Sequence, residues 1–356
     1  MVEQASVRQH HPAGMSTAGV PGETLNGMTQ TAPGDHVDPT RDEPSPRVET
    51  RSGGMVRVPG LTFLMGSDRH YPEEAPAHRV AVDTFCIDTQ PVTNAEFGRF
   101  VRETGYVTVA EKPPDPADYP GADPSLLVPA SSVFVRPGRR VDLHNPYAWW
   151  TYVPGADWRH PQGPDSSIDT RPDHPVVHVA WPDVEAYAEW VGKQVPTEAE
   201  WELAARGGLD GAEYAWGEEL TPGGRWMANT WQGEFPNQNT GEDGYEGTSP
   251  VGRFPANGYG LLDMIGNVWE WTADWYAAHT ETSRACCTMD NPRGGDRDGS
   301  IGAADRIPRR VMKGGSHLCA PNYCRRYRPA ARHAEPVHTS ACHVGFRCVA
   351  RKPHAS

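Results

Sequence analysis

The chain has 356 residues, a formal net charge of −13 and a sequence pI near 5.6. An acidic surface repels nucleic acid and favours basic ligands, which argues against a nucleic-acid partner. No apolar run reaches the roughly 18 residues that a transmembrane helix needs, which argues against a membrane partner. Seven cysteines, an odd number, make a poor disulfide framework, and the N-terminus lacks a signal-peptide pattern. We therefore expect a cytoplasmic protein in a reducing compartment.

Glycine and proline content indicates the fold class. The 37 glycines and 35 prolines make up about a fifth of the chain, against a usual share of about 12%. Such a chain has many turns, so we expect an irregular α+β fold with short strands and few helices rather than a repeating βαβ fold. Residues 1–52 contain no aromatic residue and are rich in Pro, Gly, Ser and Thr. We expect a disordered tail there, followed by one large domain over residues 53–353.

Short strands and a helix open this domain. Residues 55–67 alternate in polarity around a Pro-Gly pair and predict two strands, and residues 80–88 predict another. A capping-box pattern from Thr93 to Glu96 then begins an amphipathic helix, which Gly105 ends.

Loops and further helices follow. Residues 111–144 begin Pro- and Asp-rich and predict a long loop. We expect this loop to line a site, because Trp149 and Trp150 come next and loops rich in Trp and Pro commonly wall binding grooves. Residues 174–181 predict a buried strand that leads into a helix from Pro182.

Two more segments complete the middle of the chain. A second capping box at 197–200 begins a helix that ends at Gly207. Residues 280–310 predict a mobile polar loop. The vicinal cysteines at 286–287 have no CxxC partner, which argues against a zinc site in this loop.

Two acidic, glycine-rich segments lie between residues 228 and 276. Their carboxylates, amide side chains and turn carbonyls are the hard oxygen ligands that calcium prefers. Plain Asp-Gly turns explain the same spacing, and neither segment has the order of ligands of an EF-hand.

Four of the seven cysteines lie in residues 313–349. Cys319 and Cys324 are five residues apart, which puts them on opposite faces of a strand and about 140° apart on a helix. A turn at 320–322, the sequence Ala-Pro-Asn, allows both thiols to converge on one ligand. Two thiolates suit a soft, low-coordinate cation such as Cu(I), which also has oxygen chemistry. Buried, inert thiols are the alternative.

The motifs GGSHLCAPNYCRRYRPAAR and GFRCV, with PGLTFLMGS, PTEAEWELAARGG and GNVWEW, resemble those of the formylglycine-generating enzymes of bacterial type (sulfatase-modifying factors). The resemblance implies the irregular α+β domain of this family and of the C-type-lectin-like superfamily. It implies a copper-dependent oxidase that converts the cysteine of a CxPxR motif to Cα-formylglycine. The implied partners are an extended or unfolded sulfatase segment, dioxygen and a thiol reductant, and the implied assembly is a monomer.

The resemblance also implies residue roles. Cys319 and Cys324 would bind Cu(I), and the substrate cysteine would add a third sulfur. Ser316 and Tyr323 match polar positions beside the copper, and Trp269 matches a residue that shields the oxygen pocket. For the tryptophans, ordinary core packing remains open.

The same pattern implies substrate and calcium positions. Trp149 matches a wall of the peptide groove, and His343 falls near the pocket, where a purely structural histidine remains open. The first calcium site would use the side chains of Asn229 and Asp243 with the carbonyls of Thr230 and Tyr245. The second would use the side chains of Asp263 and Glu270 with the carbonyls of Gly266 and Val268.

Two other function classes share this fold. Iron-dependent sulfoxide synthases carry an additional N-terminal helical domain with a histidine triad, whereas His10, His11 and His36 lie in a segment without helical periodicity. A non-catalytic binding paralogue would have no reason to keep both cysteines.

The arginines at 325–332 fit a salt-bridged structural role better than a nucleic-acid patch. Residues 111–144 depart from the family pattern, so the pocket for the substrate arginine stays unassigned.

Overall fold

The fold is that of a computed structural model, which separates residues 1–47 from a second unit, residues 48–356. The structure describes residues 50–51, 54–118, 121, 123–279, 288–302 and 306–351. The expected tail over residues 1–52 lies outside these residues, except for strand β1 (Thr50–Arg51), which pairs with β2. Cys286 and Cys287 also lie outside them. Within the described ranges, none of the helices has both the length and the apolar character needed to cross a bilayer.

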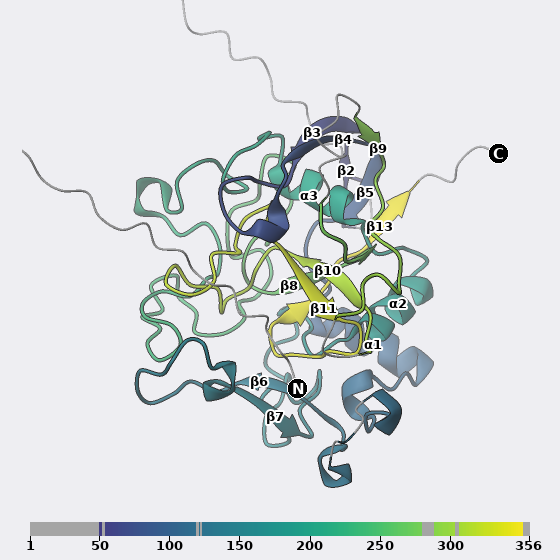
Figure 1. The fold of residues 1–356 in the computed structure, drawn as a ribbon, viewed down its shortest axis with the longest axis vertical. Helices are drawn as coiled ribbons and strands as arrows, with labels where there is room; N and C mark the ends of the chain where they lie inside the picture. Colours follow the sequence, from purple (N-terminus) through teal and green to yellow (C-terminus); the bar gives the residue numbers. More distant parts are fainter. Residues whose placement is uncertain are drawn as a thin grey trace, which may run out of the picture. The chain divides into compact units, whose positions relative to one another are not determined.

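Two small sheets use the first strands of the domain (Figure 1). One has the order β1-β2-β5-β13, with β2 (Met55–Val58), β5 (Phe85–Asp88) and β13 (Val349–Arg351). The other has the order β3-β4-β9, with β3 (Leu61–Met65), β4 (His78–Val82) and β9 (Met289–Asp290). The two strands predicted within residues 55–67 are therefore confirmed. The single strand predicted over residues 80–88 is wrong, because the chain leaves one sheet after β4 and enters the other at β5.

A third sheet crosses the middle of this unit in the order β11-β10-β8-β12 (Figure 1). Its strands are β8 (Trp269–Trp275), β10 (Arg309–Lys313), β11 (Arg332–Pro336) and β12 (Val344–Gly345). The segment 280–310, predicted to be only a loop, contributes β9 and the first residues of β10. This sheet positions the cysteine stretch, because that stretch connects β10 to β11.

A two-stranded hairpin, β6 (Ala130–Phe134) and β7 (Trp150–Pro154), lies apart from the β3-β4-β9 sheet (Figure 1). The predicted loop over residues 111–144 therefore contains a strand, which is a correction. On the outer edge of β6, the amide of Ser132 donates to the carbonyl of Ser340 at 3.2 Å, and the carbonyl of Ser132 accepts from Cys342 at 3.0 Å. The hairpin is thereby joined to the C-terminal segment.

Three α-helices follow the predicted signals. α1 (Asn94–Thr104) has its capping box at Thr93 and ends at Gly105, where φ is +70°. α2 (Trp181–Trp190) has a proline in its first turn. α3 (Glu198–Arg206) has its capping box at Thr197 and ends at Gly207. The remaining helical turns are short 3-10 segments: η1 (Pro72–Glu74), η2 (Val109–Glu111), η3 (Pro116–Asp118), η4 (Pro124–Leu126), η5 (Pro146–Ala148) and η6 (Pro222–Gly224).

The segment 174–181 is not a strand, although residues 175–181 are buried as predicted. Its one ladder contact is an isolated bridge between Pro175 and Thr93. His178 has a φ of +58°, which lies outside the extended region and interrupts a strand.

The interior has two apolar clusters. The larger packs the helices against the sheets and contains Trp201, Trp271 and Cys319 among many others. The smaller one consists of Trp149, Trp231, Phe235, Leu318 and Ala320. Because Ala320 lies in the turn between Cys319 and Cys324, the smaller cluster includes part of the cysteine turn.

Candidate functional site

The predicted turn brings the two cysteines together. The amides of Tyr323 and Cys324 both donate to the carbonyl of Ala320, at 3.1 and 2.9 Å. The Sγ atoms of Cys319 and Cys324 then lie 3.3 Å apart, and both residues are free thiols. Cys319 is buried, whereas Cys324 is half-buried. The pair is therefore preformed and reachable from one side.

A tandem glycine precedes the turn for a steric reason. Gly314 and Gly315 have φ values of +93° and +70°, which favour glycine. A Cβ atom on Gly315 would lie 2.8 Å from the carbonyl oxygen of Arg326. Only glycine allows the chain before the turn to pass so close to the chain after it.

The two thiols have unequal acidities. Burial raises the pKa of Cys319. The hydrogen bond from Cys319 lowers the pKa of Cys324 to about 6, against the opposing effect of burial, and Arg326 contributes to the lowering. The opposite directions of the two pKa shifts favour negative charge on Cys324 over Cys319.

Residues far away in the sequence surround Cys324. Tyr71 precedes η1, and its hydroxyl accepts a hydrogen bond from the amide of Arg325 at 3.0 Å. The guanidinium of Arg326 lies 3.9 Å from the centroid of the Tyr71 ring, forms an ion pair with Glu73 and places Nη1 3.9 Å from Cys324 Sγ. Sequence reasoning missed Tyr71 and Glu73, because their contacts with Arg325 and Arg326 span 254 and 253 positions and no local pattern connects the two segments.

Aromatic rings hold Tyr323 in place. Its ring stacks on Phe235 at 4.7 Å and meets Trp149 edge to face at 5.4 Å. Trp149, predicted as a groove wall, is only 1% exposed and lies in the smaller core cluster. Its indole Nε1 has no hydrogen-bond partner among the described residues. Trp149 thus supports Tyr323, while its neighbour Trp150 lies over His343 at 4.8 Å.

The remaining predicted residues divide into two groups. Ser316 adjoins the pair, because its amide donates to Cys319 Sγ at 3.4 Å, while its hydroxyl accepts from the amide of Leu318. Trp269 and His343 contact each other through a backbone hydrogen bond of 2.8 Å. Burial lowers the pKa of His343, and its Nδ1 has no hydrogen-bond partner within the part of the chain that the structure describes.

The first acidic segment brings its four predicted residues together. Asp243 accepts hydrogen bonds from the amides of Thr230 at 3.1 Å and Tyr245 at 2.9 Å. The side-chain amide nitrogen of Asn229 donates to Gly247, but its buried Oδ1 has no partner among the described residues. Burial raises the pKa of Asp243, since its charge is only partly compensated. The segment therefore holds a partly compensated carboxylate and a buried amide oxygen without a partner among the described residues.

The second acidic segment is partly neutralised by a cation of the protein itself. Both carboxylate oxygens of Glu270 accept from Arg347, and one also accepts from the indole of Trp201 at 2.8 Å. Asp263 has a buried Oδ1 without a partner in the described ranges, and burial raises its pKa to about 6. A Cβ atom on Gly266 would lie 2.3 Å from the carbonyl oxygen of Asn229, so this segment closely approaches the first. Val268 is buried between Gly266 and Glu270.

Comparison with known proteins decides the family. Residues 40–352 match the family described as sulfatase-modifying factor enzyme 1-like domain. The formylglycine-generating enzyme of Mycobacterium tuberculosis is 56% identical over 299 residues, which cover 83% of this chain and 97% of that protein. The chain belongs to the formylglycine-generating enzyme family.

One solved structure and one further relative add information about the fold and the family. The solved structure of PvdO from Pseudomonas aeruginosa has a TM-score of 0.56 at 25% identity and covers 83% of this chain and 93% of that one. The expected α+β fold class is thereby confirmed. A mouse protein named inactive C-alpha-formylglycine-generating enzyme 2 is 46% identical over 227 residues, covering 62% of this chain and 69% of its own.

The arginine cluster of the C-terminal stretch forms ion pairs, as predicted. Arg326 pairs with Glu73, and the buried Arg328 and Arg332 pair with buried carboxylates. These carboxylates belong to Glu74 and Glu198, respectively. A buried arginine that has lost its partner would leave a costly uncompensated charge, so the pairs hold the C-terminal stretch against distant elements.

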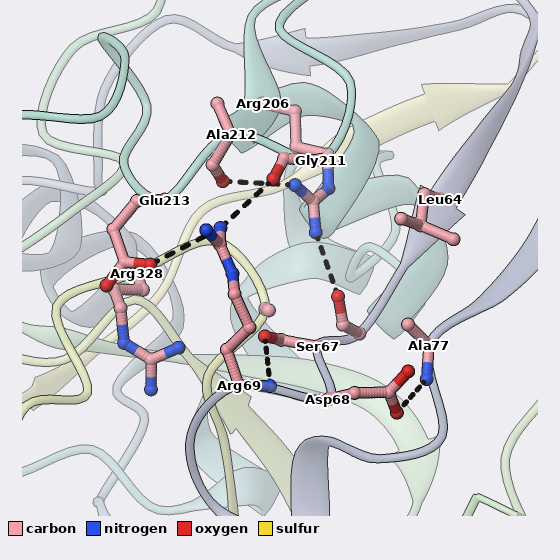
Figure 2. A pocket seen from close by; sticks show the side chains of 12 residues that line it. Leu64, Ser67, Asp68, Arg69, Ala77, Arg206, Gly211, Ala212, Glu213 and Arg328 are labelled. Carbon is pink, nitrogen blue, oxygen red and sulfur yellow. Dashed lines mark hydrogen bonds and ion pairs between the residues drawn. The ribbon is translucent and has the colours of Figure 1, made fainter.

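A hollow of about 230 Å³ lies close to the cysteine turn. Figure 2 shows Arg69 reaching between Gly211 and Glu213, and Arg206 directed toward Ala212. Glu213 also lies 3.9 Å from Arg325, the residue that follows Cys324. The hollow therefore adjoins the cysteine turn through Glu213, but neither cysteine lines it.

Proposed function

We propose that this protein is an oxidase that converts the cysteine of a CxPxR motif in sulfatases to Cα-formylglycine, with Cys319 and Cys324 as copper ligands. One observation carries the proposal: the two sulfurs converge at 3.3 Å in a buried turn. Membership of the formylglycine-generating enzyme family supports the reaction type, because the Mycobacterium tuberculosis relative bears that name.

The donor atoms fit Cu(I). Two facing sulfurs 3.3 Å apart suit a soft monovalent ion better than calcium or magnesium, which prefer oxygen. Among the described residues, no group of three or more His, Cys, Asp or Glu side chains is placed to hold a metal ion. The proposed site rests on two thiolates, and the substrate thiolate would bind beside Cys324, which is the less buried of the two. When bound, Cu(I) supplies the activation of dioxygen.

The reaction balances with a reductant. The substrate CH2–SH group loses two hydrogens to become a thioaldehyde, which water hydrolyses to the aldehyde with release of hydrogen sulfide. Dioxygen takes up four electrons and four protons to become two water molecules. The substrate supplies two of each, and two external thiol groups supply the other two as they join in a disulfide.

The residues of the turn have defined tasks in this proposal. The Ser316 amide contacts Cys319, and Tyr323 directly precedes Cys324; in this proposal the Tyr323 hydroxyl orders water and moves protons. Phe235 and Trp149 fix the Tyr323 ring by stacking. Trp269 excludes bulk water from the oxygen pocket.

We base substrate recognition on the negative net charge of the protein and on the contact between the rings of Trp150 and His343. The rings of His343 and of Trp150, the first residue of β7, contact each other in a tilted arrangement, and we assign His343 to substrate binding. The net charge of −13 suits a peptide that carries arginine.

We also propose structural calcium in the two acidic segments. The open oxygens of Asn229 and Asp263, together with the raised pKa values of Asp243 and Asp263, favour a hard cation there. The first site fits better, because Arg347 already neutralises Glu270 in the second.

We place the activity in the cytoplasm, in a monomer. The described cysteines are all free thiols, which suits a reducing compartment. Size-exclusion chromatography coupled to light scattering tests the monomer, and a second copy in the particle would contradict it.

A non-catalytic binding paralogue is the second candidate. The mouse relative that is named inactive supports keeping this alternative. The converging cysteines favour the oxidase, since a binding module has no use for a thiol pair of this geometry.

The deciding experiment uses a synthetic peptide that contains CTPSR. We expect purified protein with Cu(I), air and a thiol reductant to exchange one sulfur and two hydrogens of the peptide for one oxygen, as read by mass spectrometry. An aldehyde-specific hydroxylamine probe confirms the product. Copper-loaded protein that leaves the peptide unchanged would overturn the oxidase in favour of the binding paralogue.

A further inference from the structure

We propose that Arg326 is the fixed positive counter-charge of the cysteine pair and that Tyr71 and Glu73 are the residues that position it. This inference rests on the proposed copper function of Cys319 and Cys324. It assigns a role to the segment around η1, which comes from the other end of the domain and contributes no metal ligand.

The Arg326 guanidinium contacts Glu73 on one side and Cys324 on another. Its Nε and Nη2 both donate to Oε1 of Glu73, with Nε at 3.1 Å. This leaves Nη1 on the opposite side, 3.9 Å from Cys324 Sγ. The ion pair therefore points its positive end at the sulfur and holds its carboxylate on the far side.

Tyr71 fixes this arrangement through two independent contacts. Its ring lies under the guanidinium of Arg326, 3.9 Å from ring centroid to Cζ. Its hydroxyl accepts a 3.0 Å hydrogen bond from the amide of Arg325, the residue between Cys324 and Arg326. One side chain thus restrains both the backbone and the charged group beside the sulfur.

The site needs such a charge. Cu(I) held by two thiolates has a net charge of −1, and the substrate thiolate makes it −2. Transfer of an anion into a buried site is unfavourable unless a cation or hydrogen-bond donors compensate it. Arg326 is only 16% exposed and is the cation that directs a nitrogen at the pair.

The neighbouring arginine provides a matched control. Arg325 is 48% exposed, and its guanidinium lies 3.9 Å from Glu213, on the side of the hollow. Changing Arg325 to glutamine removes the same charge one residue away and keeps the backbone amide that bonds to Tyr71.

The test measures Cu(I) affinity by anaerobic competition with a chromophoric chelator. We expect Arg326→Gln to weaken Cu(I) binding about tenfold or more, the loss typical of a charge-assisted contact. Arg326→Lys should recover most of the affinity, because it restores the charge. Tyr71→Phe, which keeps the stacked ring, should weaken binding about threefold, and Arg325→Gln should match wild type. A cooperative thermal unfolding transition, measured for each metal-free variant, tests whether that variant is folded.

The outcomes separate this inference from the proposed function. Wild-type affinity in folded Arg326→Gln would overturn the counter-charge. If that variant does not fold, the other two variants decide. Unchanged Cu(I) affinity in Tyr71→Phe would overturn the counter-charge. A loss of affinity in Arg326→Lys as large as in a Cys319→Ser control would also overturn it. Unchanged Cu(I) affinity in Cys319→Ser would overturn the copper site itself.

Discussion

The cysteine turn and the first acidic segment are in direct contact but are built in opposite ways. The amide of Trp231, next to Thr230, donates to the carbonyl of Cys319 at 3.0 Å. In the turn, the two sulfurs lie within contact distance of each other. In the acidic segment, the buried Oδ1 of Asn229 has no partner among the described residues.

This difference indicates what a metal would do in each region. The turn is held by backbone hydrogen bonds and aromatic packing between groups of the protein itself. The acidic segment leaves polar atoms uncompensated, which costs stability until a cation binds. We therefore expect changes in the turn to alter activity, and changes in the acidic segments to alter stability.

The largest effect should come from removing a sulfur. We expect Cys324→Ser to lower peptide conversion by at least about 10³-fold, because a thiolate ligand is lost. The thermal unfolding midpoint should stay near that of wild type. Cys86→Ser, a change of another half-buried free thiol, is the control and should retain activity. Equal activity of Cys324→Ser and wild type would remove Cys324 from the site.

The second effect concerns pH and Asp263. The folded protein holds the proton of this carboxyl more tightly than the unfolded chain, since the folded-state pKa is about 6 and the unfolded value about 4. Stability of the calcium-free protein should therefore fall by about 3 kcal/mol as the pH rises through this interval. Urea unfolding across the interval measures the fall. Asp263→Asn should remove this part of the slope, and an unchanged slope would contradict the assignment.

Calcium should act at the first acidic segment. At a free concentration of 100 times its dissociation constant, a ligand that binds only the folded state adds about 2.7 kcal/mol to the free energy of unfolding. We expect calcium to stabilise wild type in this way and to have little effect on Asp243→Asn. The neighbouring exposed Glu242→Gln is the matched control. A full calcium response in Asp243→Asn would place the cation elsewhere.

The smallest effect should come from one hydroxyl. Tyr323→Phe keeps the ring on Phe235 and Trp149 but removes the hydroxyl to which we assign the ordering of water at the cysteines. We expect the rate of conversion to fall about tenfold, with unchanged Cu(I) affinity and stability. A loss of stability without a loss of rate would assign Tyr323 to packing alone.

Local chemistry explains which elements could be predicted from sequence. The capping boxes at Thr93 and Thr197 and the turn between the cysteines each depend on fewer than six consecutive residues, and all three are confirmed. Elements that depend on the rest of the fold were predicted wrongly. The strand at 80–88 is divided because its halves join different sheets, and the segment at 174–181 bends at His178.

The candidate site shows the same limit. The contact between Tyr71 and the cysteine turn has no local signal, because it joins residues 254 positions apart. A pair of tryptophans predicts aromatic packing but does not tell a groove wall from a core. The structure buries Trp149 under Tyr323 and leaves Trp150 beside His343.

The account is tested most directly by peptide conversion measured as Cu(I) is titrated into metal-free protein. We predict that the rate rises until one Cu(I) is bound per chain and then stays constant. We also predict that a folded Cys319→Ser, Cys324→Ser double variant shows no rise at all. Conversion that proceeds without copper, or that rises equally in the double variant, would contradict the assignment of the cysteine pair as the active centre.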